Sequence, residues 1–261
     1  MNFGSIIVRR AYWFLSAQFG IDLRKIPRFF FGLPRYIRDF FRFRSNYSGK
    51  IEFVPCLHDW YEEGGVTKSE YFWQDLLVAR YIYAASPKKH VDIGSRVDGF
   101  VAHVASFREI EVFDVRPIIA SIPGIIFKQA DLMKPLDVFM NYCDSLSCLH
   151  ALEHFGLGRY GDPIDTKGFE LGIINMSKLL VAQGVFYLSV PIGIERVEFN
   201  ANRVFDPRTI IRLAENNGLN LMALKVIDPG GKVVESLLDD HVIANLAIQH
   251  YALGLFTFRK L

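Results

Sequence analysis

From residue 69 onward, short apolar runs alternate with segments whose apolar residues recur every three or four positions. The runs predict strands at residues 90–94, 110–115, 124–127, 141–146, 185–190, 221–227 and 251–259. The other segments predict helices at residues 69–84, 99–107, 165–181 and 207–217. Strands and helices that alternate in this way favour an α/β fold, with a mostly parallel seven-stranded sheet and helices on both faces.

The apolar run at residues 251–258 is the last of these predicted strands. We place it at an edge of the sheet, where its free backbone groups would pair with another subunit. This placement favours a homodimer.

The sequence of residues 1–50 is richer in basic and aromatic residues than the rest of the chain and predicts a basic, aromatic helical extension. A lead-in segment with one helix follows at residues 51–89, and the main domain covers residues 90–261. The whole chain has a net charge of +2, but residues 1–44 hold nine basic and two acidic side chains. Aromatic rings lie among these charges, and Pro27, Gly32 and Pro34 divide the segment into short helices.

Three interpretations of the basic, aromatic segment remain open. Its rings pack on the main domain while its arginines stay in water, or it docks on an anionic membrane surface or partner. Binding to nucleic acid is the least favoured of the three.

Composition narrows the class of protein. A hydrophobic content of 51% with 22% charged residues excludes disorder over most of the chain, and no apolar run is long enough for a membrane span. The first residues do not resemble a secretory signal. Cys56, Cys143 and Cys148 include no CxxC pair, which argues against a disulfide framework or a zinc site. We therefore expect a cytoplasmic protein without a bound metal.

Candidate chemistry lies at the ends of the first three predicted strands. Gly94 permits a sharp turn before a helix whose first amides attract an anionic group. Asp114 ends the second strand, where a carboxylate accepts hydrogen bonds from ribose hydroxyls, and Asp131 follows the third strand at a spacing suited to an adenine amino group. Either aspartate alone is also explained as a turn residue. Together they predict a nucleoside site.

With these residues in place, the chain resembles the class I S-adenosylmethionine-dependent methyltransferases over residues 70–261. The resemblance rests on DIGS at residues 92–95, Asp114, ADL at 130–132 and CLHALEHFGLGRYGDPID at 148–165. It implies a Rossmann-like fold and S-adenosylmethionine as cofactor. The implied cofactor-binding residues are Asp92, Gly94, Ser95, Asp114, Val115, Asp131, Leu132, Ser147 and His150.

The phrase GLGRYGDPID, with VPIG at residues 190–193 and FNANRVF at 199–205, resembles a narrower and poorly characterised methyltransferase-like family. Members of that family are associated with bacterial surface polysaccharide synthesis. The resemblance therefore implies an O-methyltransferase acting on a sugar hydroxyl, or a related polar group, of a polysaccharide precursor. The acceptor would be a nucleotide-linked or lipid-linked sugar, and the enzyme would be cytoplasmic or peripheral at the inner membrane face.

A hydroxyl nucleophile benefits from a base that takes its proton during attack. His154 is the first candidate and Asp162 the second, although a histidine at the start of a helix is as often a packing residue. The candidate substrate-binding residues are Glu153, Arg159, Tyr160, Asn200, Asn202 and Arg203.

A second hypothesis competes with the enzyme. Ser95, Arg96 and Asp98 stand in a turn that usually holds more glycines. The chain would then be a non-catalytic binding or assembly module that retains the methyltransferase fold.

Overall fold

The computed structural model describes residues 3–65 and 67–261, so residues 1 and 2 of the predicted extension lie outside the described residues. The chain divides into two compact units, Met1–Val66 and Thr67–Leu261. The first unit holds α1 (Phe3–Phe19), α2 (Lys25–Arg44) and a short 3-10 helix, Asp59–Tyr61. Helix α2 runs through Pro27, Gly32 and Pro34, so the predicted division into short helices at these residues is wrong. Within the described residues, no helix has both the length and the apolar character needed to cross a membrane.

The border between the units falls inside the predicted lead-in segment. Helix α3 (Glu70–Ala85) belongs to the second unit, where Val78 and Ile82 are fully buried. The compact domain therefore begins near residue 67 and includes the helix that we expected to precede it.

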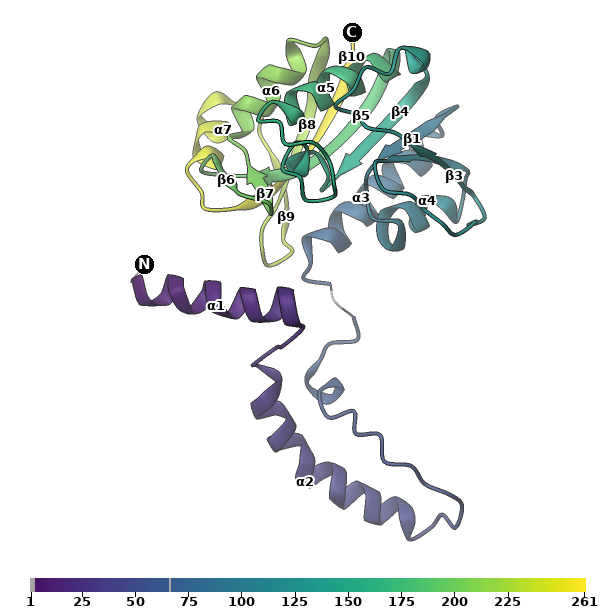
Figure 1. Cartoon of the computed structure of the whole chain (residues 1–261), viewed down its shortest axis with the longest axis vertical. Coiled ribbons are helices and arrows are strands. Elements are labelled where there is room, and N and C mark those ends of the chain that lie inside the picture. Colours follow the sequence, from purple (N-terminus) through teal and green to yellow (C-terminus); the bar gives the residue numbers. More distant parts are fainter. Residues whose placement is uncertain (1–2, 66) are drawn as a thin grey trace. The chain divides into compact units, whose positions relative to one another are not determined.

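The second unit is built on an eight-stranded sheet (Figure 1). Its strands are β1 (His90–Ile93), β2 (Ile110–Asp114), β3 (Ile125–Gln129), β4 (Cys143–Leu149), β5 (Leu180–Ile192), β8 (Leu219–Ile227), β9 (Val233–Ser236) and β10 (Ala252–Lys260). They lie in the order β3-β2-β1-β4-β5-β10-β8-β9. A separate hairpin consists of β6 (Arg196–Glu198) and β7 (Asn202–Val204).

The direction of the strands corrects the predicted sheet. Strands β3, β2, β1, β4 and β5 are mutually parallel, whereas β10 runs antiparallel to both β5 and β8, and β9 runs antiparallel to β8. The sheet is thus mixed and has eight strands instead of seven. Strand β10 lies inside the sheet, so the edge position predicted for residues 251–258 is wrong, and this strand gives no support to a homodimer.

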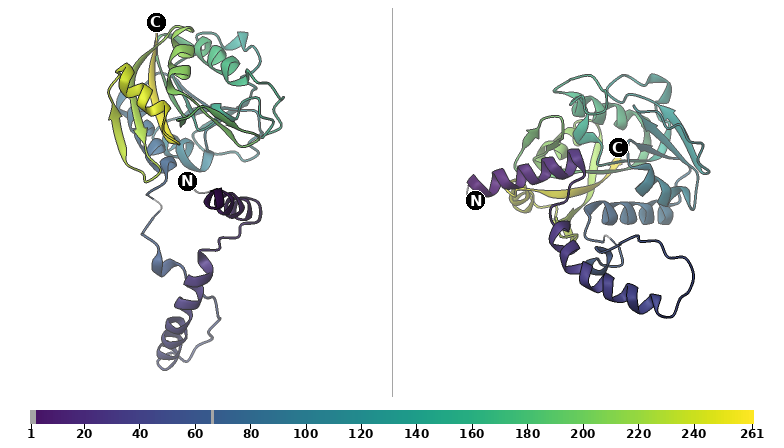
Figure 2. Two further views of the ribbon diagram at one scale, coloured as in Figure 1. Left: turned by 90° about the vertical axis from the view of Figure 1, so that its left-hand side faces the viewer. Right: turned by 60° about the horizontal axis from the view of Figure 1, so that its bottom comes forward.

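Helices cover both faces of the sheet, as predicted (Figure 2). On one face, α3 and α4 (Ala102–Ala105) form a core with Val112 and Tyr187; on the other, α5 (Gly168–Leu179), α6 (Pro207–Glu215) and α7 (Asp240–Ala247) contribute to a core around Phe186 and Leu188. Neighbouring residues of β5 therefore point to opposite cores, as the pleat requires. Helix α7 was not predicted; Asp239 begins it by accepting hydrogen bonds from the amides of His241 and Val242.

The fold places several chain segments at one edge of the sheet. Strands β1, β2 and β4 are neighbours and parallel, so their carboxyl ends meet there, and the loops that follow them can line one crevice. The predicted helix at residues 99–107 begins after this edge with a π-helical turn, Val97–Val101, that continues into α4.

Candidate active site

A cavity of about 280 Å³ opens at the carboxyl ends of β1, β2 and β4. Six of the nine predicted cofactor residues line it, namely Gly94, Asp114, Val115, Asp131, Leu132 and His150. The carboxylates of Asp114 and Asp131 therefore share one crevice with the turn at Gly94, which is the arrangement that a nucleoside site requires.

The remaining three predicted cofactor residues lie behind the cavity wall. Asp92 is fully buried; its carboxylate accepts hydrogen bonds from the Ser95 amide (3.0 Å), the Ser95 hydroxyl (2.6 Å) and the Ser147 hydroxyl (2.5 Å). Burial raises the pKa of Asp92 to about 6. These three side chains brace the turn, so the structure does not place them on the cavity.

Gly94 is needed at this turn for two reasons. Its φ of +67° is in the left-handed region that favours glycine, and an added Cβ would lie 3.2 Å from the Cβ of Ala151. The turn therefore stays close to the loop that follows β4. Arg96 lies on the cavity rim, where its guanidinium pairs with Asp98 at 2.8 Å instead of filling the crevice.

Asp114 carries a partner that the sequence reasoning missed. Its Oδ1 accepts hydrogen bonds from the Arg116 amide (2.8 Å) and Nε (3.1 Å), and its Oδ2 accepts one from Nη2 (2.8 Å). The Arg116 guanidinium also lies 4.1 Å from the centre of the Tyr160 ring. The predicted ribose acceptor is thus in place, but an arginine two residues away holds it. The sequence DVR gave a signal for this pair.

Asp131 is held in a short loop after β3. Its Oδ1 accepts a hydrogen bond from the Met133 amide at 3.0 Å. Asn175, on α5, fixes the same loop by donating to the carbonyls of Leu132 (2.8 Å) and Lys134 (3.0 Å). This loop presents Leu132 and Asp131 to the cavity from the side of β3.

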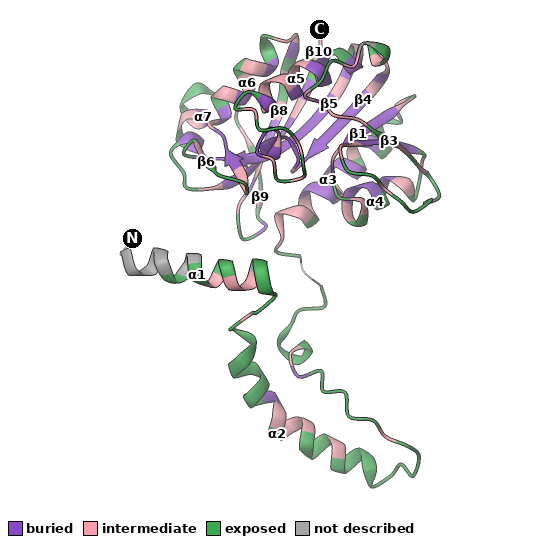
Figure 3. Cartoon of the chain, in the orientation of Figure 1, coloured by how far each residue is buried: buried purple, intermediate pink, exposed green. Residues whose placement is uncertain are grey.

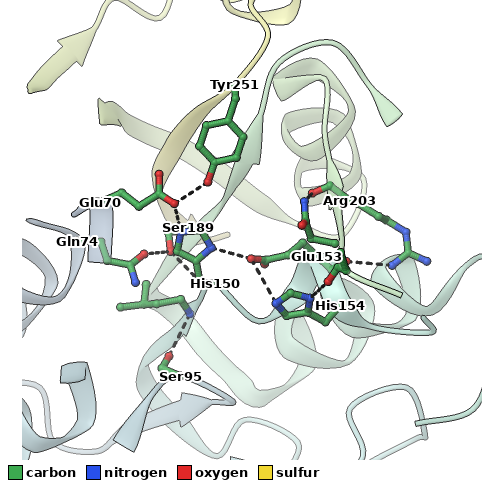
Figure 4. Close-up of polar contacts among 12 residues, drawn as sticks. Glu70, Gln74, Ser95, His150, Glu153, His154, Ser189, Arg203 and Tyr251 are labelled. Carbon is green, nitrogen blue, oxygen red and sulfur yellow. Dashed lines mark hydrogen bonds and ion pairs between the residues drawn. The ribbon is translucent and has the colours of Figure 1, made fainter. Parts of the chain in front are cut away.

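His150 is the centre of a buried polar network (Figure 4). Its Nδ1 lies 2.7 Å from Glu153 Oε1, its Nε2 lies 3.4 Å from Glu70 Oε1, and its ring stacks on Tyr71 at 4.4 Å. The Tyr251 hydroxyl donates to Glu70 at 2.6 Å. Burial lowers the pKa of His150, but the carboxylates of Glu153 and Glu70 outweigh it and raise the pKa to about 9. His150 is therefore an imidazolium at neutral pH.

The backbone at His150 is fixed as firmly as its side chain. Its φ is +52°, and its amide donates to the Ser189 hydroxyl at 3.1 Å, which in turn donates to Gln74 at 2.5 Å (Figure 4). Glu70, Gln74, Tyr71 and Tyr251 were absent from the predicted site. They lie far from His150 along the chain, and no local pattern marks them.

His154 faces the cavity in a defined tautomer. Its Nδ1 lies 2.7 Å from the carbonyl of Ala201, so Nδ1 carries the proton and Nε2 keeps its lone pair. Nε2 lies 3.8 Å from Glu153 Oε1. Burial and the nearby Arg159 guanidinium both lower the pKa of His154, although Glu153 opposes them. A neutral imidazole with a free Nε2 can accept a proton from a ligand in the cavity.

Asp162 lines the cavity but is already committed to the loop around it. Its Oδ2 accepts hydrogen bonds from the amides of Gly156 (2.9 Å) and Gly158 (3.2 Å), and its Oδ1 accepts one from the Tyr160 amide (3.1 Å). Three amide donors stabilise the carboxylate, and protonation would weaken all three hydrogen bonds. The geometry therefore fits a loop-organising role better than the base predicted as the second candidate.

The predicted substrate residues divide into two groups. Arg159 and Tyr160 line the cavity. Glu153 and Arg203 are buried, and Asn200 and Asn202 do not line the cavity either. Asn200 lies at the exposed turn of the β6–β7 hairpin, with a φ of +63°.

Arg203 supports the loop from behind. Its guanidinium donates to the carbonyls of Glu153 (3.4 Å), Phe155 (2.5 Å) and Asp165 (3.5 Å) and is only 5% exposed (Figure 4). Burial lowers the pKa of Arg203. Its donors are turned to backbone carbonyls, so the substrate-binding role predicted for Arg203 does not fit this position.

Comparison with known proteins places this geometry in context. A family model described as "Caenorhabditis protein of unknown function, DUF268" matches residues 109–223, less than half of the chain. No curated protein matches.

Solved structures match more of the chain. A putative sarcosine dimethylglycine methyltransferase from Galdieria sulphuraria is 14% identical with a TM-score of 0.50, covering 72% of this chain and 85% of that one. A putative methyltransferase from Bacillus halodurans is 11% identical with a TM-score of 0.50, covering 70% and 98%. The second unit has a methyltransferase fold. At these identities the likeness shows the fold alone.

Proposed function

We propose that the chain is an S-adenosylmethionine-dependent methyltransferase. One observation carries the proposal: Gly94, Asp114, Asp131 and His154 line the same cavity. A nucleoside site and a proton acceptor thus share one crevice within a methyltransferase fold.

The residues on the cavity fit the cofactor. The bare Gly94 backbone suits the close approach of an amino acid moiety, Asp114 suits the ribose hydroxyls, and Leu132 with Asp131 suits the adenine. The cavity volume of about 280 Å³ is just below the range of roughly 300–1,000 Å³ typical of small-molecule sites. Movement of Arg116 away from Asp114 would enlarge it and free both carboxylate oxygens.

His154 is the residue that we assign to proton transfer. When bound, the cofactor supplies an electrophilic methyl group on a sulfonium. The Ala201 carbonyl holds His154 Nδ1–H, which would leave Nε2 to take the proton of the acceptor hydroxyl while the acceptor oxygen displaces the sulfur of the cofactor from the methyl carbon. Glu153 Oε1, 3.8 Å from Nε2, then stabilises the imidazolium. Its Oε2 is buried and has no hydrogen-bond partner among the described residues, so it can turn toward the new charge.

The acceptor that we propose is a sugar hydroxyl, or a related polar group, of a surface polysaccharide precursor. Tyr160 and Arg159 line the cavity beside His154. The Arg159 guanidinium donates to the Ala201 carbonyl at 2.8 Å and lies 3.4 Å from His154 Nδ1. An arginine in this position suits the phosphate of a nucleotide-linked or lipid-linked sugar.

A lipid-linked acceptor would be found at the inner face of the cytoplasmic membrane. The excess of basic residues in residues 1–44 supports a peripheral location there, because cytoplasmic leaflets carry anionic lipids.

Calorimetry with S-adenosylhomocysteine tests the cofactor site. Asp114→Ala should weaken binding about 10- to 100-fold, because hydrogen bonds to a charged group contribute about 1.5–3 kcal/mol. Glu215→Ala, an exposed change on α6, should leave the affinity unchanged. A wild-type protein that binds no S-adenosylhomocysteine even at high ligand concentration would refute the proposal.

The ion pair between Arg116 and Asp114 favours one alternative, a non-catalytic binding or assembly module. In such a module the arginine would permanently replace the ribose hydroxyls. The same calorimetry separates the two functions, since the module would bind no S-adenosylhomocysteine.

A further inference from the structure

Helix α2 of the first unit carries a continuous apolar surface. Ile26, Phe30, Ile37 and Phe41 are spaced four, seven and four residues apart, and a rotation of 100° per residue places all four within about 60° of one another. They are 51%, 66%, 45% and 65% exposed, respectively. We call these four residues the apolar stripe.

The chain that returns from α2 covers a different side of the helix. Gly32 is buried against Leu57, whose Cβ would lie 3.1 Å from an added Cβ, and the rings of Phe40 and Phe53 pack with their centres 4.7 Å apart. Most of α2 is exposed or intermediate, with one short buried stretch (Figure 3). The Arg35 guanidinium lies over the ring of Trp60 at 3.9 Å. The first unit thus uses one side of α2 for its own packing and leaves the apolar stripe outside it.

Positive charge accompanies the stripe. Lys25, Arg28, Arg38, Arg42 and Arg44 are exposed on the same helix, which contains one acidic residue, Asp39. A helix with aromatic rings on one side and arginines on the other lies flat in a lipid interface, with its rings in the boundary between headgroups and acyl chains. Each basic residue close to an anionic bilayer contributes about 1 kcal/mol.

We propose that the apolar stripe of α2 docks on an anionic lipid bilayer, with the surrounding arginines bound to headgroups. Charge decides between occupants: a bilayer rich in anionic lipid offers both the acyl boundary for Phe30 and Phe41 and the negative charge for Arg38 and Arg42. This inference rests on the membrane location proposed above and names the surface of the protein that would contact the membrane.

Co-sedimentation of the full chain with vesicles tests the docking. The wild-type protein should bind vesicles of phosphatidylcholine with phosphatidylglycerol and bind phosphatidylcholine alone weakly, and added salt should weaken the binding. The double variant Phe30→Ser, Phe41→Ser should lower the partition coefficient tenfold or more, because burial of each ring contributes about 1.5–3 kcal/mol.

Phe199→Ser is the matched control. Phe199 is 75% exposed at the turn of the β6–β7 hairpin, so the same chemical change is made on an equally accessible ring outside the stripe. Its partition coefficient should equal that of the wild type. Equal losses in both variants would overturn the assignment to α2.

Other outcomes also overturn the docking. Absence of vesicle binding by the wild type refutes it, and so does salt-sensitive binding to single-stranded DNA without vesicle binding. A double variant with unchanged vesicle binding but a lower melting temperature would show that the rings pack within the protein. None of these results depends on S-adenosylhomocysteine binding, so the methyltransferase proposal can fail or survive separately.

Discussion

The cavity has two sides that use their polar groups differently. On the proposed cofactor side, Gly94, Asp114 and Asp131 lie at or just after the ends of β1, β2 and β3 and line the cavity. On the proposed acceptor side, polar side chains bind the backbone of the loop that follows β4. Asp162 accepts hydrogen bonds from three loop amides, and Arg203 donates to carbonyls of the loop from behind.

The difference follows from what supports each side. A parallel strand satisfies its own backbone through its neighbours, so the side chains at its end bind near neighbours in the chain: Asp114 holds Arg116, and Asp131 holds the Met133 amide. A long loop has no such ladder, and its buried amides and carbonyls must find side-chain partners. Around this cavity, the carboxylates at the strand ends thus hold groups two residues away, whereas Asp162 and Arg203 organise a whole loop.

The strongest test concerns His154, the base that we propose on the acceptor side. His154→Gln should lower the rate of methyl transfer about 10²- to 10⁴-fold, because glutamine cannot take the acceptor proton. The rate is measured by transfer of labelled methyl groups to cell-envelope extracts. The affinity for S-adenosylhomocysteine should stay unchanged.

Asp162→Asn serves as the comparison for this variant. Because Asp162 is bound by three amides, asparagine should weaken the loop and lower activity less than His154→Gln does. A larger loss for Asp162→Asn than for His154→Gln would make the aspartate the base and reverse our assignment.

Arg203 tests whether the acceptor side is internally braced. Arg203→Met should lower the free energy of unfolding by about 2–4 kcal/mol, since the carbonyls that it binds are left buried without donors. Urea unfolding measures the change. The exposed Arg208→Met should alter stability little, and an Arg203 variant as stable as wild type would contradict the bracing role.

His150 lies where the two sides meet, and its charge predicts a pH effect. Its pKa is raised from 6.5 to about 9, so its stabilising contribution is complete below pH 6.5 and is lost as the pH rises through 9. Wild-type unfolding free energy should therefore fall by about 1–3 kcal/mol between these pH values.

His150→Gln should remove most of this fall, whereas the exposed His241→Gln should retain it. Urea unfolding at several pH values between 6 and about 9.5 provides the comparison. Identical pH dependence in the wild type and His150→Gln would show that the imidazolium contributes nothing.

The smallest expected effect belongs to Arg116 on the cofactor side. Arg116→Ala frees the Asp114 carboxylate, so S-adenosylhomocysteine should bind a few-fold more tightly if the guanidinium must be displaced. Lys134→Ala, near Asp131, is the control and should change the affinity less. Weaker binding in Arg116→Ala would mean that the arginine contacts the ligand.

Much of the fold could be predicted because hydrophobic periodicity reports on each element separately. The helix predicted at residues 207–217 is present as α6, which begins after its N-cap Asp206 and ends at Glu215. Strand order is different, because the pattern of residues 251–259 is that of any buried strand and does not encode its neighbours. Its alternation could not distinguish the edge of the sheet from its middle.

The same distinction between local pattern and long-range pairing applies to the site. Asp114 and Asp131 could be predicted because the carboxyl ends of neighbouring parallel strands lie at the same edge of a sheet. The partners of His150 could not be found, since Glu70 and Tyr251 reach it only through folding of α3 and the chain before β10. Arg203 was misassigned because the sequence does not tell a buried guanidinium from an exposed one.

The interior position of β10 has a consequence for how the domain is made. Strands β5 and β8 are bridged only by residues 252–260, so a chain emerging from the ribosome exposes the inner edges of both strands until that segment arrives. Until then, the unfinished sheet has two unpaired strand edges. The domain is completed by a late pairing between segments that are distant in the sequence.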